Sequence, residues 1–295
     1  MNRLTLCLLL LAAPLLAQER GGVSYIQYLE NGASILPADN SGAMQAGLNI
    51  PLYPGDRLDT DRQGRLEAAL ADGSLLWLDD RTQVELRALA RTDGFSDQRS
   101  YLFVREGQAA LEALYEPRRG EEPVLGFTSG DFYAFDAGLY GVEMRGRSAR
   151  VRLYYGRGEL VTDRGSVLLQ AGEEATVYED GFVDRRRLRR DDDAFASWVE
   201  RRRELRLRSQ SSRYTGEALS SYSYQLDQNG SWVYLPDIAG YAWRPVVAVG
   251  WQPYYDGYWR WSPGGWFWVG YEPWGYVTYH YGRWSWFPGY GWMWV

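Results

Sequence analysis

The last third of the chain repeats one aromatic pattern three times, and this repeat restricts the fold more than any other feature. Each copy begins at a glycine, Gly230, Gly257 or Gly282, followed by two aromatic residues two positions apart, a proline turn and a second such pair. Residues two positions apart on a strand point to the same face. The pattern therefore predicts three short antiparallel hairpins that pair aromatic rings across their strands.

The rings of this repeat supply the candidate binding residues. Residues 232–295 contain 24 aromatic side chains, including 12 of the 14 tryptophans. A segment of this size leaves part of its apolar surface unburied. Some rings can form the core, while others are available to a glycan, a protein partner or a cationic ligand. The candidates are the tryptophans of the second and third copies: Trp259, Trp261, Trp266, Trp268, Trp284, Trp286, Trp292 and Trp294.

Residues 22–183 have the pattern of an all-β domain. Runs that alternate apolar and polar residues are separated by glycine or Asp-Gly turns. Residues 66–71 and 75–78 flank one such turn and predict a hairpin. A last pair of strands is predicted at 167–169 and 175–178. No run shows a sustained 3.6-residue period, so we expect a sandwich or roll of short antiparallel strands.

Turn motifs in this region occur in a recognisable order. They are Pro54-Gly55-Asp56-Arg57-Leu58-Asp59-Thr60, Gly64-Arg65-Leu66-Glu67, Leu70-Ala71-Asp72-Gly73-Ser74, Arg105-Glu106-Gly107-Gln108-Ala109, Tyr155-Gly156-Arg157-Gly158-Glu159-Leu160-Val161 and Gln170-Ala171-Gly172-Glu173-Glu174. With these motifs the region resembles the FecR domain. The resemblance implies a non-catalytic interaction domain on the periplasmic side of the envelope.

FecR proteins of iron signalling add a membrane span and a cytoplasmic part that holds a sigma factor. Neither is expected here, so the resemblance implies the envelope-side module alone. The alternative function is a regulatory, signal-receiving protein that works with a separate membrane partner. The aromatic repeats resemble a Trp/Tyr/Gly-rich module of unknown function found behind FecR domains in bacterial envelope proteins. By composition they are also similar to choline-binding wall repeats, which hold quaternary ammonium in aromatic cages.

Residue types that many catalytic and metal sites need are missing. The chain has no lysine, its one cysteine is Cys7 and its one histidine is His280. These counts exclude a Schiff-base lysine, a P-loop, a cysteine nucleophile in the mature chain and a zinc site of the Cys/His type. The acids in residues 59–64 lack the closing glutamate of a calcium loop. The adjacent carboxylates at 79–80 and 121–122 are expected to be solvated turn residues rather than a glycosidase pair.

We therefore predict a protein that is not an enzyme and has no metal and no cofactor, with a structural role for His280. The candidate partners are a cell-wall glycan or an envelope protein. No pattern in the sequence specifies an oligomeric state.

A basic segment separates the two regions. Residues 185–208 hold 10 arginines and 5 acids, a net charge of +5, whereas residues 18–184 hold 17 arginines and 28 acids, a net charge of −11. The opposite charges favour docking of this segment on its own β-domain, with contact to an anionic envelope polymer as the alternative. A nucleic-acid partner is not expected, because the chain is acidic overall and has the features of an exported protein.

The same segment contains a predicted helix. Three aspartates at 191–193 precede the apolar stripe Phe195, Trp198 and Val199, and arginines follow it. Acids at the N-terminus and cations at the C-terminus favour a capped helix of about four turns. The serine-rich residues 209–212 that follow are predicted to be a flexible joint.

Residues 1–17 have the pattern of a secretory signal peptide. A single positive charge at Arg3 precedes an apolar run from Leu4 to Ala17. We expect cleavage after Ala17, a periplasmic or secreted location, and no transmembrane segment in the mature chain; the alternative is a retained anchor. The predicted fold is mainly β: a FecR-like sandwich or roll, one linker α-helix and a C-terminal array of aromatic hairpins. The predicted parts are a signal peptide (1–17), a FecR-like β-domain (22–183), a basic helical linker (184–213) and an aromatic hairpin domain (214–295).

Overall fold

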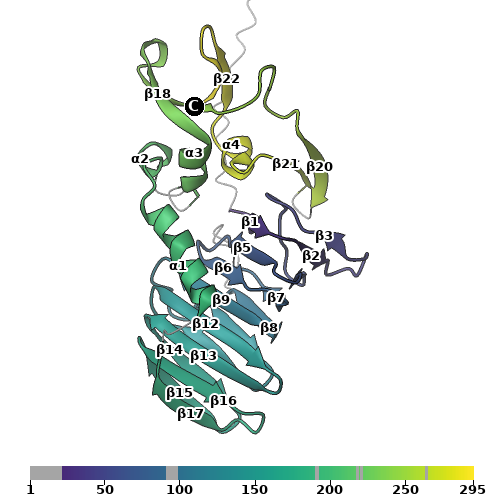
Figure 1. Ribbon diagram of the computed structural model, residues 1–295, viewed down its shortest axis with the longest axis vertical. Coiled ribbons are helices and arrows are strands. Elements are labelled where there is room, and N and C mark those ends of the chain that lie inside the picture. The colour runs from purple at the N-terminus through teal and green to yellow at the C-terminus, as the bar shows by residue number, and fades with distance from the viewer. Residues whose placement is uncertain (1–21, 91–98, 190–192, 217–218, 220–221, 263–264) are drawn as a thin grey trace, which may run out of the picture.

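The chain is mainly β, as predicted, and elongated, with a β-sandwich at one end and aromatic hairpins at the other (Figure 1). The computed structural model describes residues 22–90, 99–189, 193–216, 219, 222–262 and 265–295. The predicted signal peptide, its cleavage site after Ala17, and Asp191 and Asp192 of the predicted cap lie outside these residues.

Two large sheets form the sandwich. The first has eight strands in the order β1 (Tyr25–Glu30), β5 (Arg65–Ala69), β6 (Leu75–Leu78), β9 (Gln108–Ala113), β12 (Gly138–Arg145), β13 (Ser148–Tyr155), β16 (Glu173–Val177) and β17 (Val183–Arg187). The second has nine strands in the order β15 (Gly165–Gln170), β14 (Arg157–Thr162), β11 (Gly130–Ala134), β10 (Val124–Phe127), β8 (Tyr101–Glu106), β7 (Gln83–Ala88), β4 (Arg57–Thr60), β2 (Ala33–Leu36) and β3 (Met44–Gln45). The predicted hairpin at 66–78 is confirmed as β5 and β6, in which Ala69 pairs with Leu75.

The two sheets enclose one apolar core, because alternate residues of their strands face inward. On β7, for example, Val84 and Leu86 are buried and Glu85 is half-buried. The first sheet contributes Leu66, Leu76, Leu111, Val142 and Leu153, and the second contributes Leu58, Val84, Leu102, Phe132 and Leu160.

The strands predicted at 167–169 and 175–178 exist, but they belong to different sheets. β15 pairs with β14 in the second sheet, whereas β16 pairs with β13 and β17 in the first. Gly172 has φ +81° and donates its amide hydrogen to the carbonyl of Leu153 on the first sheet at 2.8 Å. The turn therefore carries the chain from one layer to the other instead of closing a hairpin.

The basic segment begins as a strand, so the predicted boundary at residue 183 is too early. Arg185 to Arg187 form part of β17, the edge strand beside β16. The Arg185 guanidinium lies 2.7 Å from the Glu173 carboxylate, and that of Arg186 lies 2.5 Å from Glu174. Cross-strand pairs of opposite charge stabilise this edge, and its charge discourages pairing with another chain.

The predicted helix is confirmed as α1 (Ala194–Leu207), and it covers the outer face of the first sheet. Asp193 caps it by accepting a hydrogen bond from the amide of Ala196 at 3.0 Å. The predicted stripe of Phe195, Trp198 and Val199 packs on Leu75 and Trp77. All four residues of β6 are buried, because this strand meets the sandwich core on one face and α1 on the other.

Opposite charges hold α1 in place, which confirms the prediction that the basic helix docks on its own β-domain. Arg202 lies 2.7 Å from Glu67 of β5. Arg203 and Arg206 lie 2.9 and 2.5 Å from the two oxygens of Glu112 on β9. The Arg202 guanidinium also lies over the ring of Tyr28, 3.6 Å from its centroid.

The residues after α1 are not a flexible joint. The Asp227 carboxylate accepts hydrogen bonds from the Ser209 hydroxyl, from the amides of Gln210 and Ser211, and from the Ser211 hydroxyl, at 2.6–3.0 Å. Asp227 lies on α3 (Tyr224–Asn229). This single acid fixes the turn that leads into α2 (Ser212–Thr215).

The three predicted hairpins are confirmed, and they are accompanied by short helices that were not predicted. β18 (Gly230–Leu235) and β19 (Gly240–Pro245) form the first, β20 (Gly257–Ser262) and β21 (Gly265–Gly270) the second, and β22 (Trp284–Phe287) and β23 (Gly291–Trp294) the third. The first turn contains a 3₁₀ segment, η2 (Pro236–Ile238), and α4 (Gly275–His280) follows the second hairpin. Within the part of the chain that the structure describes, no helix has the length and apolar character that a bilayer crossing needs.

Candidate functional site

The second hairpin, β20–β21, is a two-stranded ribbon with one face on the sandwich and one face in solvent. Tyr258, Phe267 and Val269 pack against the sandwich core. Arg260 also points to this side, where its guanidinium contacts the Met44 sulfur at 3.0 Å. The opposite side is therefore left to the residues that alternate with these, and apart from glycine all of them are tryptophan.

The outer face of the ribbon presents three exposed indoles. Trp259, Trp261 and Trp266 are 57%, 65% and 65% exposed, whereas Trp268 is 7% exposed. Trp261 lies opposite Trp266 in the strand register, and Trp259 lies opposite Trp268. Ring centroids in both pairs are 5.4 Å apart, at interplanar angles of 77° and 68°. These edge-to-face contacts fix the ring orientations without covering the outward faces of the exposed indoles.

The first and third hairpins repeat this arrangement. In each, the aromatic pair nearest the turn is edge-to-face: Tyr234 with Tyr241 at 5.4 Å and Trp286 with Trp292 at 5.8 Å. In all three hairpins the last tryptophan of the second strand, Trp243, Trp268 or Trp294, is buried. Each repeat therefore uses its base to form core and exposes rings near its turn.

The glycine that opens each repeat makes this burial possible. A Cβ at Gly230 would lie 2.4 Å from the Trp243 ring, and one at Gly257 would lie 2.7 Å from the Trp268 ring. The buried indole therefore packs directly on the glycine backbone, which no larger residue permits.

The eight candidate tryptophans thus divide into three groups. Trp259, Trp261, Trp266 and Trp286 are exposed, Trp284 and Trp292 are half-buried, and Trp268 and Trp294 are buried. The two hairpins that carry them belong to different sheets. Only the outer face of β20–β21 brings three exposed tryptophans together.

Asn49 of the sandwich anchors the chain where this ribbon ends, and sequence analysis did not identify it. Its side-chain amide donates to the carbonyls of Gly270 and Glu272, both at 2.8 Å, and its oxygen accepts from the amide of Tyr276 at 3.2 Å. The Tyr276 ring stacks on Tyr25 of β1, with centroids 3.6 Å apart. An asparagine in an otherwise apolar run is the one local signal that could have pointed to it.

Glu272 is a second residue that the sequence analysis missed. It is buried, and one carboxylate oxygen accepts from the Trp251 indole at 2.9 Å and from the Tyr279 hydroxyl at 2.8 Å. Burial and the neighbouring carboxylate raise the pKa of Tyr279. Glu272 thus ties the connection before β20 to α4 and holds Tyr279 close to Trp268.

His280 has the structural role that was predicted for it. Its ring stacks on Phe267 with centroids 4.0 Å apart, and Nε2 donates to the Trp268 carbonyl at 3.1 Å. Burial lowers the pKa of His280 to about 4, because the charged imidazolium would lose its hydration there. The imidazole is therefore neutral near pH 7.

The acids weighed as chemical sites are each bonded to a nearby group of the protein. Asp59 pairs with Arg57 at 3.0 Å, and Asp79 pairs with Arg65 at 2.9 Å. Glu122 accepts from the amide of Gly120 at 2.9 Å. Among the described residues, no group of three His, Cys, Asp or Glu side chains is placed to hold a metal ion.

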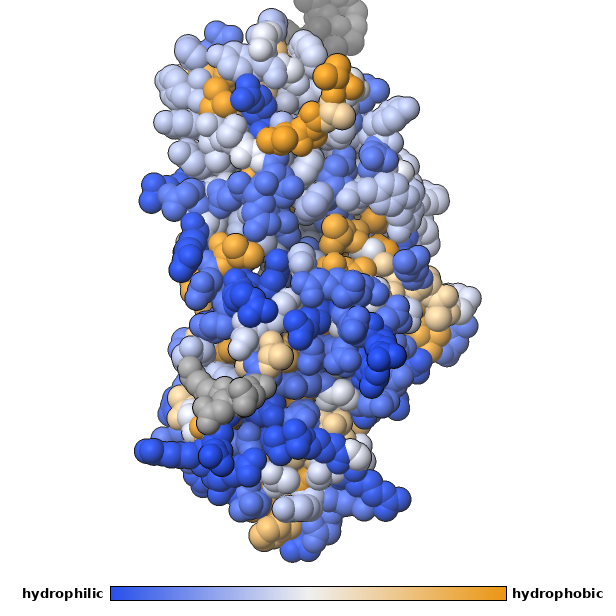
Figure 2. All heavy atoms as spheres, in the orientation of Figure 1, coloured by the Kyte–Doolittle hydropathy of each residue, from blue (hydrophilic) through white to orange (hydrophobic). Residues whose placement is uncertain are grey.

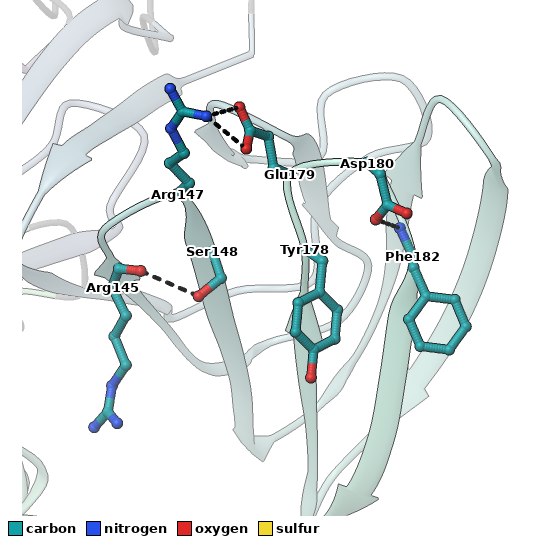
Figure 3. A pocket seen from close by; sticks show the side chains of 7 residues that line it. All are labelled: Arg145, Arg147, Ser148, Tyr178, Glu179, Asp180 and Phe182. Atoms are coloured by element: carbon teal, nitrogen blue, oxygen red, sulfur yellow. Dashed lines mark hydrogen bonds and ion pairs between the residues drawn. The ribbon is translucent and has the colours of Figure 1, made fainter.

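A shallow depression of about 630 Å³ lies at the far end of the sandwich, between the turns of β12–β13 and β16–β17. Figure 3 shows Arg147 and Glu179 facing each other across it, 3.0 Å apart, and Tyr178 and Phe182 side by side. These charged groups are exposed and paired with each other, so the depression lacks the buried polar group of a built binding site.

In a comparison with known protein families, one family matches the part of the chain that contains the hairpins. Residues 223–295 match a family of unknown function, DUF6600. No curated protein matches the chain. Two crystal structures of a candidate anti-sigma factor from Parabacteroides distasonis ATCC 8503 are similar, each at 16% identity over 48% of this chain, with TM-scores of 0.39 and 0.40. The matched regions cover 63% and 64% of those two chains, which is less than two thirds of their length.

Proposed function

We propose that the protein is a non-enzymatic binding protein of the cell envelope and that the outer face of β20–β21 binds a cell-wall glycan. The observation that carries this proposal is the set of three exposed indoles, Trp259, Trp261 and Trp266, on one face of a ribbon whose other face packs on the sandwich. Rigid rings lose little conformational entropy on binding, which favours their use at contact sites.

The chemistry of this face fits a sugar ring better than a charged ligand. All four side chains larger than glycine on it are tryptophan, and Arg260 points to the opposite side. A pyranose presents an apolar C–H face that can pack flat on an indole. Because the outer face has no charged side chain of its own, ring contacts rather than ion pairs would determine affinity.

The rest of the chain supports the ribbon in this proposal. The order of the turn motifs from Pro54 to Glu174 supports a FecR-like identity for the sandwich, which then acts as a rigid, non-catalytic carrier. The signal-type pattern of residues 1–17 supports export to the periplasm or beyond. The single histidine, half-buried and neutral, the absence of lysine and the absence of any cysteine besides Cys7 support a role without catalysis.

The test is retention of the purified protein on insoluble peptidoglycan sacculi. We expect Trp261→Ala with Trp266→Ala to weaken retention about tenfold, which corresponds to about 0.7 kcal/mol for each ring. Both side chains are exposed, so the variant should keep the unfolding midpoint of the parent. The matched control is Tyr178→Ala with Phe182→Ala, which removes another exposed aromatic pair from the opposite end of the molecule.

Loss of retention in the tryptophan variant alone supports the proposal. Equal retention of a folded tryptophan variant and the parent overturns it. An equal loss in both variants also overturns it, because general stickiness of exposed rings would then explain retention.

A further inference from the structure

A second exposed surface lies away from the ribbon, at the end of the molecule opposite the sandwich. Figure 1 shows that the turn of β18–β19, the turn of β22–β23 and the chain that leaves β19 all project from this end. We name residues 234–241, 246–250 and 286–292 the apical turns. Asp237 is their one charged residue, although charged side chains normally make up about a quarter or more of a soluble surface.

Aliphatic side chains project from the apical turns into solvent. Val249 is 107% exposed and Val246 is 79% exposed, and Val247 and Ile238 are also exposed. Figure 2 shows orange, hydrophobic surface at this end among pale spheres, whereas the rest of the visible face is mostly blue. Exposed apolar surface gathered at one place marks a contact site rather than ordinary scatter.

Amphipathic rings accompany these aliphatic residues. Tyr234 and Tyr241 are exposed on the first turn, and Trp286 and Tyr290 on the third. Tyrosine and tryptophan beside aliphatic residues are the combination found where proteins meet the boundary between lipid headgroups and acyl chains.

We propose that the apical turns form a lipid-binding surface that inserts Val246 and Val249 into the outer layer of a bilayer. A side chain as exposed as Val249 has almost no neighbours of its own, so a rigid protein partner would need a matching pocket for it. A fluid bilayer accepts projecting side chains from separate turns without such a pocket. The inference does not depend on glycan binding, because it uses neither the residues nor the face of β20–β21.

The near absence of charge determines how such binding would behave. Contact driven by apolar burial does not require anionic lipid and is insensitive to salt. The mature chain, which starts at residue 18, should therefore sediment with sucrose-loaded vesicles of pure phosphatidylcholine, and adding phosphatidylglycerol or sodium chloride should change the bound fraction little. Val246→Asp with Val249→Asp should lower the partition coefficient about tenfold or more, because carboxylates resist transfer into lipid.

A site-specific label locates the contact. Cys7 is the only cysteine and lies in the predicted signal peptide, so Val249→Cys in the mature chain accepts a nitrobenzoxadiazole label at one position. We expect its emission to rise and shift to the blue on addition of phosphatidylcholine vesicles, and dithionite to quench it more slowly. The matched control carries the same label at Arg147→Cys, an exposed site on the far end of the sandwich, and should not respond.

Both valines are exposed, so the double aspartate variant should unfold at the same denaturant concentration as the parent. The proposal is overturned if the label at residue 249 does not respond to vesicles, or if the aspartate variant sediments as well as the parent. It is also overturned if the apical turns instead join two copies of the chain, which would appear as a dimer in light scattering that the aspartate variant abolishes.

Discussion

The side-chain amide of Asn49 donates to the carbonyl oxygen of Gly270, 221 residues further along the chain, at 2.8 Å. Asn49 belongs to the sandwich and Gly270 closes β21. With its bonds to Glu272 and Tyr276, one buried side chain satisfies three backbone groups at the junction of the two regions. Polar groups that are buried together in this way stabilise a structure when every partner is present.

Asn49→Ala should therefore destabilise the protein by about 3 kcal/mol, because it leaves buried backbone groups without partners. Asn31→Ala is the matched control, since both Asn31 and Asn49 have a positive φ, but the side-chain hydrogen bond of Asn31 is exposed. Urea unfolding measures both variants. Equal loss of stability in the two would show that backbone conformation, and not the buried contact, accounts for the effect.

Arg202→Met should cost about 3–5 kcal/mol, because it leaves the buried carboxylate of Glu67 without its cation. Arg201 lies on the same helix and is exposed, so Arg201→Met should change the free energy of unfolding by about 0.5 kcal/mol or less. The comparison is made by chemical denaturation at low salt. If the two variants are equally stable, the ion pair does not hold α1 on the sheet.

The stability of the protein should fall as the pH is lowered from 7 to 5, partly because of His280. Its folded-state pKa of about 4 lies below the ordinary value of 6.5. In this range the unfolded chain takes up a proton that the folded chain does not, so acid favours unfolding. This group should lower the free energy of unfolding by about 2 kcal/mol between pH 7 and pH 5. His280→Gln keeps a donor for the Trp268 carbonyl and removes the titration.

The check is the free energy of unfolding of parent and His280→Gln at pH 5, 6 and 7. The difference between the two proteins should change with pH in the stated direction. A difference that stays constant would mean that the imidazole titrates alike in both states.

The hairpins could be predicted from the sequence because their signal is local. Trp259 and Trp261 are two positions apart, and that spacing fixes a common face wherever the strand lies. The face that meets the sandwich could not be predicted, since Phe267 and Val269 are as apolar as the tryptophans that alternate with them. Contact with the core decides which rings remain exposed.

The misplaced strands have a similar explanation. Gly172 is a turn glycine of the kind that hairpins also use. The sequence therefore does not distinguish a turn within one sheet from a crossing between two sheets. Arginine runs such as 185–187 are not typical of strands, and here Glu173 and Glu174 on the neighbouring strand make the pairing favourable. Asp227 orders residues 209–211 from 16 to 18 positions away, a distance at which no local pattern signals the contact.

Val269 lies within the family match that starts at residue 223, yet its side chain belongs to the core of the sandwich. The stretch of chain that matches the family therefore packs partly on the sandwich and not only on itself. Without the residues before 223, this stretch would keep its tryptophans, but Val269 and Tyr276 would lose the sandwich residues that they pack on. The contacts that orient the indoles of β20–β21 would be lost with them.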